Sequence, residues 1–187
     1  MAKPLDTSTT LTLRDGALRI VVVSDTHGKP HPKSAEVIAA QHPDHVLHAG
    51  DIGDLQVLDR LAKIAPLSAV RGNVDAHTDG VPDTLTIDVC DGDQRLFTML
   101  LLHIGVNGPR LRADVARLAR AAGARIVVCG HSHVPFIGRD GEIAIFNPGS
   151  IGPRRFQLPI VFGVIDVSRQ RVAMKHVDCE SGQQWLP

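Results

Sequence analysis

Short strands and amphipathic helices alternate through the first half of the chain, and this alternation leaves few folds open. Apolar runs rich in β-branched residues predict strands at Leu18–Ser24, His45–Ala49 and Pro66–Val70. Helical spacing predicts helices at Pro32–Ala40 and Leu55–Ile64 between them. The second helix would bury a face formed by Leu55, Leu58, Leu61 and Ala62. A strand–helix–strand–helix–strand order is typical of a parallel sheet joined by crossover helices.

The second half of the chain is richer in hairpins. The expected elements are the strand pairs Thr84–Val89 with Leu96–Leu102, Val134–Ile137 with Glu142–Phe146 and Ile160–Val167 with Arg171–His176, a helix at Leu111–Ala122 and a strand at Arg125–Cys129. No repeat or long linker divides the 187 residues, a length that suits one domain. We therefore predict a single α/β domain over residues 1–187, with a mixed or two-sheet β core and helices outside it.

Charge and cysteine content exclude several classes of protein. Lysine plus arginine equal aspartate plus glutamate, 20 against 20, so neither nucleic acid nor an anionic membrane is an expected partner. The wide, unpatterned spacing of Cys90, Cys129 and Cys179 argues against a disulfide framework and against a CxxC zinc site. Residues 1–15 do not have the pattern of a signal peptide, and the apolar runs have strand length. These features predict a cytoplasmic protein without a membrane span.

Polar side chains of metal-binding type follow most of the predicted strands. In chain order they are Asp25, His27, Asp51, Asn73, His103, His131 and His133. In open α/β sheets ligands bind beyond the carboxyl ends of the strands, so we expect these seven residues to gather there. On an extended segment residues i and i+2 point the same way, so Asp25 and His27 are expected to share one target, and so are His131 and His133.

Seven candidate ligands are too many for a single ion and suit two ions that share a bridge. A tetrahedral zinc takes four ligands at most. Asp51, central in the set, is the expected bridge because each oxygen of a carboxylate can face one cation. Two ions about 3.5–4 Å apart would clamp an in-line phosphoryl displacement. The mixed oxygen and nitrogen donors favour Mn, Fe, Zn or Ni over Mg or Ca.

Other polar residues near these motifs have two readings. His48 lies inside a strand, where it either orients a ligand or only packs in the core. Asp75 either orients a ligand or caps a turn, whereas Asp54 fits a helix N-cap better than a ligand. Arg154 and Arg155 fit a solvated pair better than a contact with substrate phosphate. Surface positions are expected for the remaining histidines, which are His31, His42, His45, His77 and His176.

The ordered motifs Asp25-x-His27, Gly50-Asp51, Gly72-Asn73, His103 and Gly130-His131-x-His133 resemble those of calcineurin-like metallophosphoesterases. The small prokaryotic phosphodiesterase branch, where Asn147-Pro-Gly-Ser150 also recurs, is the most similar, and the likeness covers about Leu18 to Val167. It implies a four-layer α/β/β/α sandwich of two mixed sheets flanked by helices. It also implies hydrolysis of a phosphate ester by a hydroxide that bridges two divalent ions, often Mn. One ion would take Asp25, His27, Asp51 and His133, and the other Asp51, Asn73, His103 and His131, with catalytic roles for Asp51 and Asn73.

Two positions depart from the pattern of this family. Many relatives have a histidine directly after the asparagine, where this chain has Val74, which cannot protonate a leaving group. Relatives often show Gly and then His after the residue that corresponds to His103, whereas this chain reads Ile104-Gly105-Val106. Slow turnover, or a preference for esters with an activated leaving group, is the hypothesis that follows.

Two other functions remain open. The family includes a scaffold subunit of the retromer coat, so a non-catalytic protein-binding scaffold is the main alternative. A mononuclear hydrolase of amides or lactams is the second, although it would leave three of the seven ligands unexplained. Two metal ions per chain would favour the phosphoesterase, one the mononuclear hydrolase and none the scaffold. The sequence predicts a small phosphate-ester substrate without naming it, and it leaves a homo-oligomer open.

Overall fold

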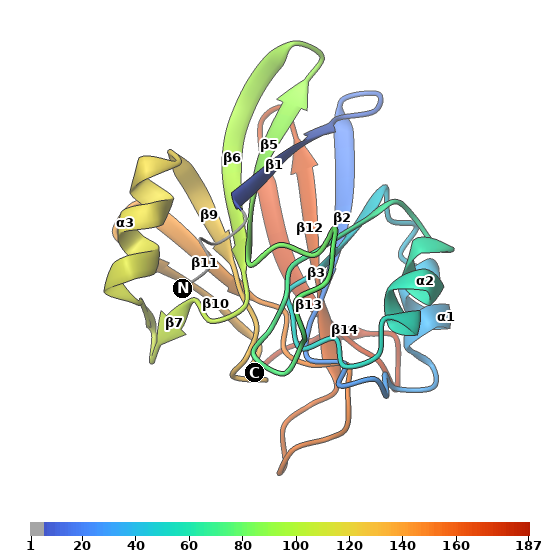
Figure 1. Ribbon diagram of the computed structural model, residues 1–187. Helices are drawn as coiled ribbons and strands as arrows, with labels where there is room; N and C mark the ends of the chain where they lie inside the picture. Colours follow the sequence, from blue (N-terminus) through green and yellow to red (C-terminus); the bar gives the residue numbers. More distant parts are fainter. Residues whose placement is uncertain (1–5) are drawn as a thin grey trace.

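The structure is a computed structural model, and it describes residues 6–187. Two six-stranded sheets pack face to face, and helices cover their outer faces (Figure 1). The four-layer α/β/β/α sandwich expected from the family resemblance is thereby confirmed. No helix within residues 6–187 has the length and apolar character that crossing a membrane requires.

The first sheet comes mainly from the second half of the chain. Its strands, in spatial order, are β1 (Asp6–Thr12), β5 (Thr84–Asp91), β6 (Gln94–Leu102), β9 (Ala124–Val128), β11 (Ile143–Asn147) and β10 (Phe136–Asp140). The predicted hairpins β5–β6 and β10–β11 are antiparallel as expected. Strands β6 and β9 run parallel, so their carboxyl ends lie at the same edge of the sheet.

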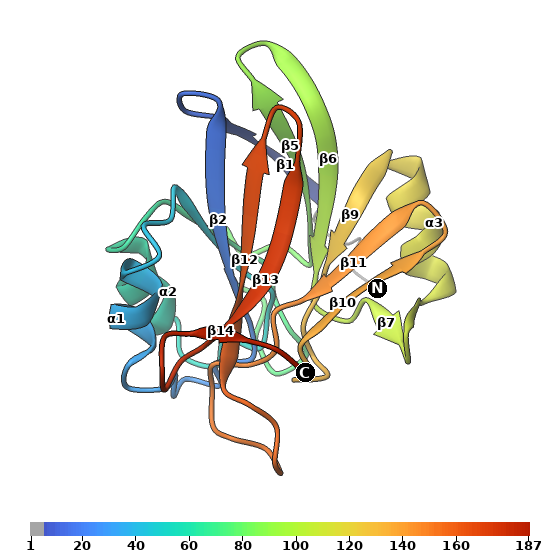
Figure 2. The same cartoon turned by 180° about the vertical axis from the view of Figure 1, so that it is seen from behind.

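The second sheet contains the predicted parallel strands. Its order is β14 (Gln184–Trp185), β13 (Val172–Asp178), β12 (Val161–Ser168), β2 (Ala17–Val23), β3 (His45–His48) and β4 (Leu67–Ala69). Strands β2, β3 and β4 are parallel, and their carboxyl ends share an edge. Figure 2 shows β12 and β13 beside β2, which β12 pairs in the antiparallel direction.

Three apolar clusters separate the layers. Between the sheets lie Ile20, Val22, Met99, Leu101 and Phe146 with their neighbours. Helices α1 (Ser34–Ala39) and α2 (Gln56–Ala62) pack on the second sheet, and α3 (Ala113–Ala121) packs on the first. Strand β2 buries both faces, because Val21 and Val23 point toward α1 and α2 while Ile20 and Val22 point between the sheets. This is why residues 20–23 of the strand are all apolar.

Two expectations about individual elements were wrong or incomplete. Helix α2 buries Val57 and Leu61, whereas Leu55 precedes the helix and is 47% exposed and Ala62 is exposed. The predicted face was therefore rotated. Strand β1, which pairs parallel with β5 at the sheet edge, was not predicted because its threonine-rich sequence leaves most of its side chains in solvent. The short pair β7 (Val106–Asn107) and β8 (Arg110–Leu111) was not predicted either.

Candidate metal centre

The predicted ligands lie on loops with an unusual backbone. Eight non-glycine residues within 6–187 have a positive φ, and five of these are predicted ligands: Asp25 (φ 55°), His27 (47°), Asp51 (54°), His131 (69°) and His133 (59°). The left-handed region is costly for residues with a Cβ and persists where surrounding structure enforces it. The loops are held in this way, since the Asp25 N–H donates to Gly50 O at 2.9 Å and the His27 N–H to Asp51 O at 3.0 Å.

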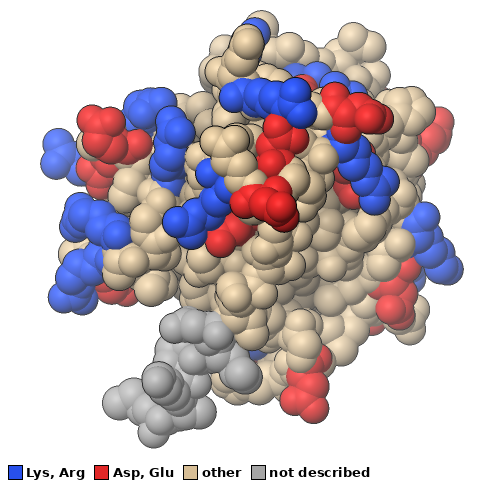
Figure 3. Space-filling model, turned by 90° about the horizontal axis from the view of Figure 1, so that it is seen from above, with Lys and Arg blue, Asp and Glu red and all other residues tan. Residues whose placement is uncertain are grey.

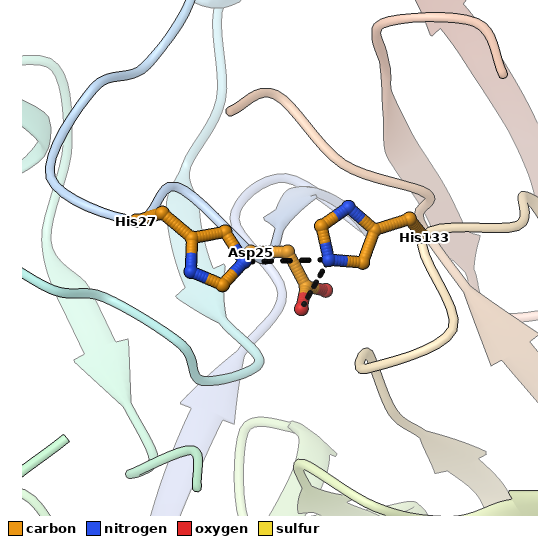
Figure 4. A group of neighbouring side chains, drawn as sticks. All are labelled: Asp25, His27 and His133. Atoms are coloured by element: carbon orange, nitrogen blue, oxygen red, sulfur yellow. Dashed lines mark hydrogen bonds and ion pairs between the residues drawn. The ribbon is translucent and has the colours of Figure 1, made fainter. Parts of the chain in front are cut away.

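Asp25, His27 and His133 form a first group of converging donor atoms (Figure 4). His133 Nε2 lies 3.3 Å from Asp25 Oδ1 and 3.3 Å from His27 Nε2. The two imidazole rings stack with centroids 5.3 Å apart. The pKa of His27 is lowered by burial, which outweighs the opposing effect of Asp51 and Asp25. A neutral His27 presents a nitrogen lone pair, the form that binds metals.

Asp51, His103 and His131 form a second group. His103 Nδ1 donates to Ala49 O at 2.7 Å, and Nε2 on the other side of the ring lies 3.2 Å from Asp51 Oδ1. Asn73 Oδ1 lies 3.1 Å from the same Nε2. A hydrogen bond from one ring nitrogen to a backbone carbonyl is the usual way in which a metal-binding histidine is oriented.

Asp51 lies between the two groups. Its Oδ1 faces His103, whereas Oδ2 lies 3.8 Å from His27 Nε2. Burial alone would raise the pKa of this carboxyl, but the hydrogen bond with His103, the Val74 N–H at 3.1 Å and nearby His27 lower it to about 2. Burial would likewise lower the pKa of His103, but Asp51 and Asp25 raise it. Asp51 is therefore ionised at neutral pH, with one oxygen toward each group.

The two groups separate His131 from His133. The sequence interpretation treated the pair as alternate residues of an extended segment with a shared target, and this was wrong. Both have a positive φ, and His131 joins Asp51 and His103 while His133 joins Asp25 and His27. This division agrees with the one that the family resemblance implies. Each group thus combines residues from loops of both sheets.

The donor atoms fit a pair of transition-metal ions. Asp25 Oδ2 accepts the His131 N–H at 3.0 Å, but Oδ1 is buried without a hydrogen-bond partner among residues 6–187. A buried carboxylate oxygen that accepts no hydrogen bond is unfavourable unless a cation balances it. Both groups offer carboxylate oxygens beside imidazole nitrogens, a mixture that suits Mn, Fe, Zn or Ni.

Two residues with open readings brace the ligand loops. His48 is fully buried; its Nδ1 accepts the Gly50 N–H at 3.2 Å, and its Nε2 lies 3.0 Å from Thr26 Oγ1. Asp75 accepts N–H groups from Ile52, Gly53 and Gly72 at 3.0, 2.8 and 2.8 Å. Neither belongs to a donor group. Both link loops that carry ligands, so they position the site from outside it.

The Asn147-Pro-Gly-Ser150 motif braces the same loops from the first sheet. Asn147 Nδ2 donates to Gly130 O at 2.7 Å, and Ser150 Oγ donates to Asp25 O at 3.0 Å. His176 Nε2 lies 2.8 Å from Asn147 O. The expected surface position of His176 was wrong, because this side chain is buried. The available signal was that His176 lies on the same strand face as Val172 and Met174, which pack against the core.

The glycines of the motifs allow close approach of these loops. A Cβ at Gly72 would overlap Asp51, and a Cβ at Gly130 would overlap Ser24 Oγ. Outside the donor groups, Asp54 Oδ1 accepts the Gln56 N–H at 2.9 Å just before α2, but the N-cap residue of this helix is Leu55, so the prediction of Asp54 as the N-cap was wrong by one residue. All three cysteines are buried and free, as expected.

The two arginines treated as a solvated pair have different surroundings. Arg154 pairs with Glu180 at 2.8 Å, away from the donor groups. Arg155 Nη2 lies 3.2 Å from His27 Nε2. Arg155 is exposed to solvent as expected, and its guanidinium also lies within hydrogen-bond distance of the first group, from the loop after Ser150.

Residues 18–170 match the family model of the calcineurin-like phosphoesterase superfamily domain. The chain belongs to this superfamily. A probable metallophosphoesterase of Methanocaldococcus jannaschii is 30% identical over 148 residues, which cover 76% of this chain and 72% of the relative. The phosphodiesterase YfcE of Escherichia coli is 27% identical over 170 residues, covering 80% and 88%. These relatives confirm the expected similarity to small prokaryotic phosphodiesterases of the superfamily.

Solved structures of other proteins share the fold. Vps29 of Entamoeba histolytica complexed with Zn²⁺ superposes with a TM-score of 0.69 at 20% identity, covering 90% of this chain and 96% of that one. This likeness concerns the fold alone.

Proposed function

We propose that this phosphoesterase-superfamily chain is a phosphodiesterase that works with two divalent metal ions, of which Mn²⁺ is the first to test and Zn, Fe and Ni the next. The observation that supports this most directly is Asp51, whose two oxygens face opposite donor groups. Asp25, His27, Asp51 and His133 would hold one ion, and Asp51, Asn73, His103 and His131 the other. Bound ions would supply Lewis-acid activation of water and of the phosphate ester.

The chain's own groups would orient the reacting atoms. The Val74 N–H fixes Asp51 Oδ1, and Ala49 O fixes the ring of His103. The Arg155 guanidinium lies beside His27, where it can donate to a phosphate oxygen of a substrate held between the groups. Asn73 supplies a neutral oxygen next to His103. The residues needed to bind and orient a phosphate ester are therefore close together.

This chain has no proton donor for the leaving group at the position after Asn73. Val74, 52% exposed, occupies the position after Asn73, and its side chain cannot donate a proton. We expect esters of acidic alcohols, such as aryl phosphodiesters, to be cleaved faster than alkyl esters or unactivated monoesters. Equal rates for unactivated monoesters and aryl phosphodiesters would contradict this selectivity.

The decisive experiment compares Asp51→Asn with Asp54→Asn in Mn²⁺-loaded protein. The amide that Asp51→Asn introduces would keep an acceptor for the Val74 N–H but lose the second anionic oxygen, so turnover of bis(4-nitrophenyl) phosphate should fall more than about a hundredfold. Asp54→Asn keeps the acceptor for Gln56 and should retain activity near that of the wild type. Full activity in folded Asp51→Asn protein would exclude Asp51 as the bridge.

Turnover and metal content together separate the alternatives. Vps29 of Entamoeba histolytica, which shares this fold, is complexed with Zn²⁺, so metal content alone does not show which function a protein of this fold has. Two ions per chain with turnover support the proposal, and one ion with amide or lactam hydrolysis supports the mononuclear hydrolase. Bound ions without turnover of any phosphate ester support the scaffold. We also propose a cytoplasmic location, in keeping with three free cysteines, and cell fractionation tests it.

A further inference from the structure

A groove of about 890 Å³ opens beside the second donor group. It runs between the β7–β8 pair and the start of α3, and Ile104, Asn107, Arg110, Arg112, Arg117 and His131 contribute to its walls. His131 is exposed and belongs to the donor group of Asp51 and His103. A molecule bound at that group therefore has direct access to the groove.

The walls of this groove carry excess positive charge. Three arginines line it against one carboxylate, Asp114. Arg112 faces Asp114 with Nε 3.3 Å from Oδ1 and Nη2 3.4 Å from Oδ2, which neutralises one arginine. Arg110 and Arg117 are exposed and form no ion pair with any residue from 6 to 187. Two guanidinium groups thus remain available to an anion.

The backbone that carries these arginines is anchored. The Leu111 N–H donates to Asp140 Oδ2 at 3.1 Å, and the Arg112 N–H donates to Gly105 O at 3.0 Å. Arg110 lies in β8, and Arg117 lies in α3, whose Val115 and Ala119 are buried against the first sheet. The positive charge is therefore presented by fixed elements, which favours binding of a defined anion over loose attraction.

The size and setting of the groove favour a small ligand. Its volume lies within the usual range of small-molecule sites, about 300–1,000 Å³. Lys and Arg are interspersed with Asp and Glu on the face at the opposite end of the molecule (Figure 3), and the whole chain has a formal net charge of zero. The groove differs from that end of the molecule in having two arginines without an ion-pair partner among residues 6–187.

We propose that this groove is a subsite for a second phosphate group of the substrate, so that the preferred substrates are phosphodiesters that carry a further phosphate beyond the scissile one. The proposal rests on the proposed phosphodiesterase function. Arg110 and Arg117 would bind the additional phosphate through charge-assisted hydrogen bonds, for which the planar guanidinium is well suited. The scissile diester would occupy the space between the two donor groups.

Two matched substrates test this subsite. Thymidine 5′-(4-nitrophenyl phosphate) and its 3′-phosphorylated form share the scissile diester and the leaving group and differ only in the added phosphate. Wild-type Mn²⁺-loaded protein should favour the phosphorylated form by about tenfold or more in kcat/KM. Arg110→Gln combined with Arg117→Gln should abolish that preference and leave the rate for the plain substrate unchanged. The control, Arg120→Gln, lies on the same helix outside the groove and should keep the preference.

A binding measurement separates failure of the subsite from failure of the proposed function. Calorimetry would compare thymidine 3′,5′-bisphosphate with thymidine 5′-monophosphate on the metal-loaded protein. Cleavage of the plain substrate without any preference for the phosphorylated form would overturn the subsite proposal and would still support the proposed phosphodiesterase function. If neither substrate were cleaved, tighter binding of the bisphosphate that the paired variant loses would support the subsite alone. Equal binding of both nucleotides in that case would overturn both proposals.

Discussion

Arg155 and Arg154 are adjacent in the chain but have different surroundings. Arg154 is tied to Glu180 and to the carbonyl of Leu158, whereas the Arg155 guanidinium lies beside His27. A cation held by His27 would repel the arginine, and a phosphate bound to that cation would attract it. Arg155 is therefore placed to respond to substrate rather than to stabilise the loop.

We predict that Arg155→Ala lowers kcat/KM for an aryl phosphodiester by about ten- to a hundredfold, because a charge-assisted hydrogen bond to phosphate is lost. Arg154→Ala removes a surface ion pair and should change kcat/KM by less than about twofold. Steady-state kinetics on both Mn²⁺-loaded variants measures the difference. Equal effects of the two substitutions would assign Arg155 a general electrostatic role only.

At the scale of elements, the loops after the strands depend on contacts with one another. The Asp75 carboxylate accepts three N–H groups and so joins the loop after β3 to the loop after β4. These two loops carry Asp51 and Asn73. A side chain outside both donor groups can therefore determine where two proposed ligands lie.

Asp75→Asn should weaken the metal centre without removing a ligand. An amide group replaces one acceptor oxygen with a donor that faces backbone N–H groups, which costs about 1–3 kcal/mol of unfolding free energy. We expect the affinity for Mn²⁺ to fall about ten- to a hundredfold, as for other residues that orient ligands. Asp79→Asn, at an exposed position in the following turn, is the control. Calorimetric titration that gave one affinity for all three proteins would count against this role.

The strands could be predicted from the sequence, but the shape of the loops could not. Apolar runs such as the one within Leu18–Ser24 predicted most strand ends to within a residue or two, since strand residues buried on both faces are apolar, although the prediction Val134–Ile137 ends three residues before β10 does. Strand β1 was not predicted, because an edge strand with exposed side chains needs no continuous run of apolar residues. The gathering of Asp25, Asp51 and His103 was predicted from strand ends. The division of His131 from His133 follows from left-handed backbone that tertiary contacts impose, and no local sequence rule encodes it.

At the scale of the whole molecule, the candidate site lies where loops that follow strands of the two packed sheets come together. Asp25, His27 and Asp51 follow strands of the second sheet, whereas His103, His131 and His133 follow strands of the first. Each donor group takes residues from both sets. Packing of the two sheets through the core between them is thus a precondition for either group.

Acid should unfold the metal-free protein partly through His48. Burial lowers the pKa of His48 to about 4 in the folded protein from 6.5. From pH 6.5 down to about 4 the unfolded chain binds a proton at this position that the folded chain does not, so the free energy of unfolding falls by about 3 kcal/mol across that window. Above pH 6.5 His48 is neutral in both the folded and the unfolded chain, so it no longer lowers the free energy of unfolding.

Urea denaturation in the presence of a chelator, repeated across this pH range, measures the effect. His48→Gln should give a shallower dependence of unfolding free energy on pH, whereas His77→Gln, at an exposed position, should match the wild type. The comparison concerns slopes, so a lower absolute stability of the glutamine variant does not affect it. Equal slopes for all three proteins would show that His48 does not carry the dependence.

The mixed origin of each donor group also bears on when the protein can acquire metal during its synthesis. Asp25, His27 and Asp51 leave the ribosome early, but the first group stays incomplete until His133 has followed and the second until His131 has followed. A nascent chain therefore has no complete group until most of its length has been translated. Loading of metal at these two groups would then be a late event in the maturation of this protein, after the two sheets have packed together.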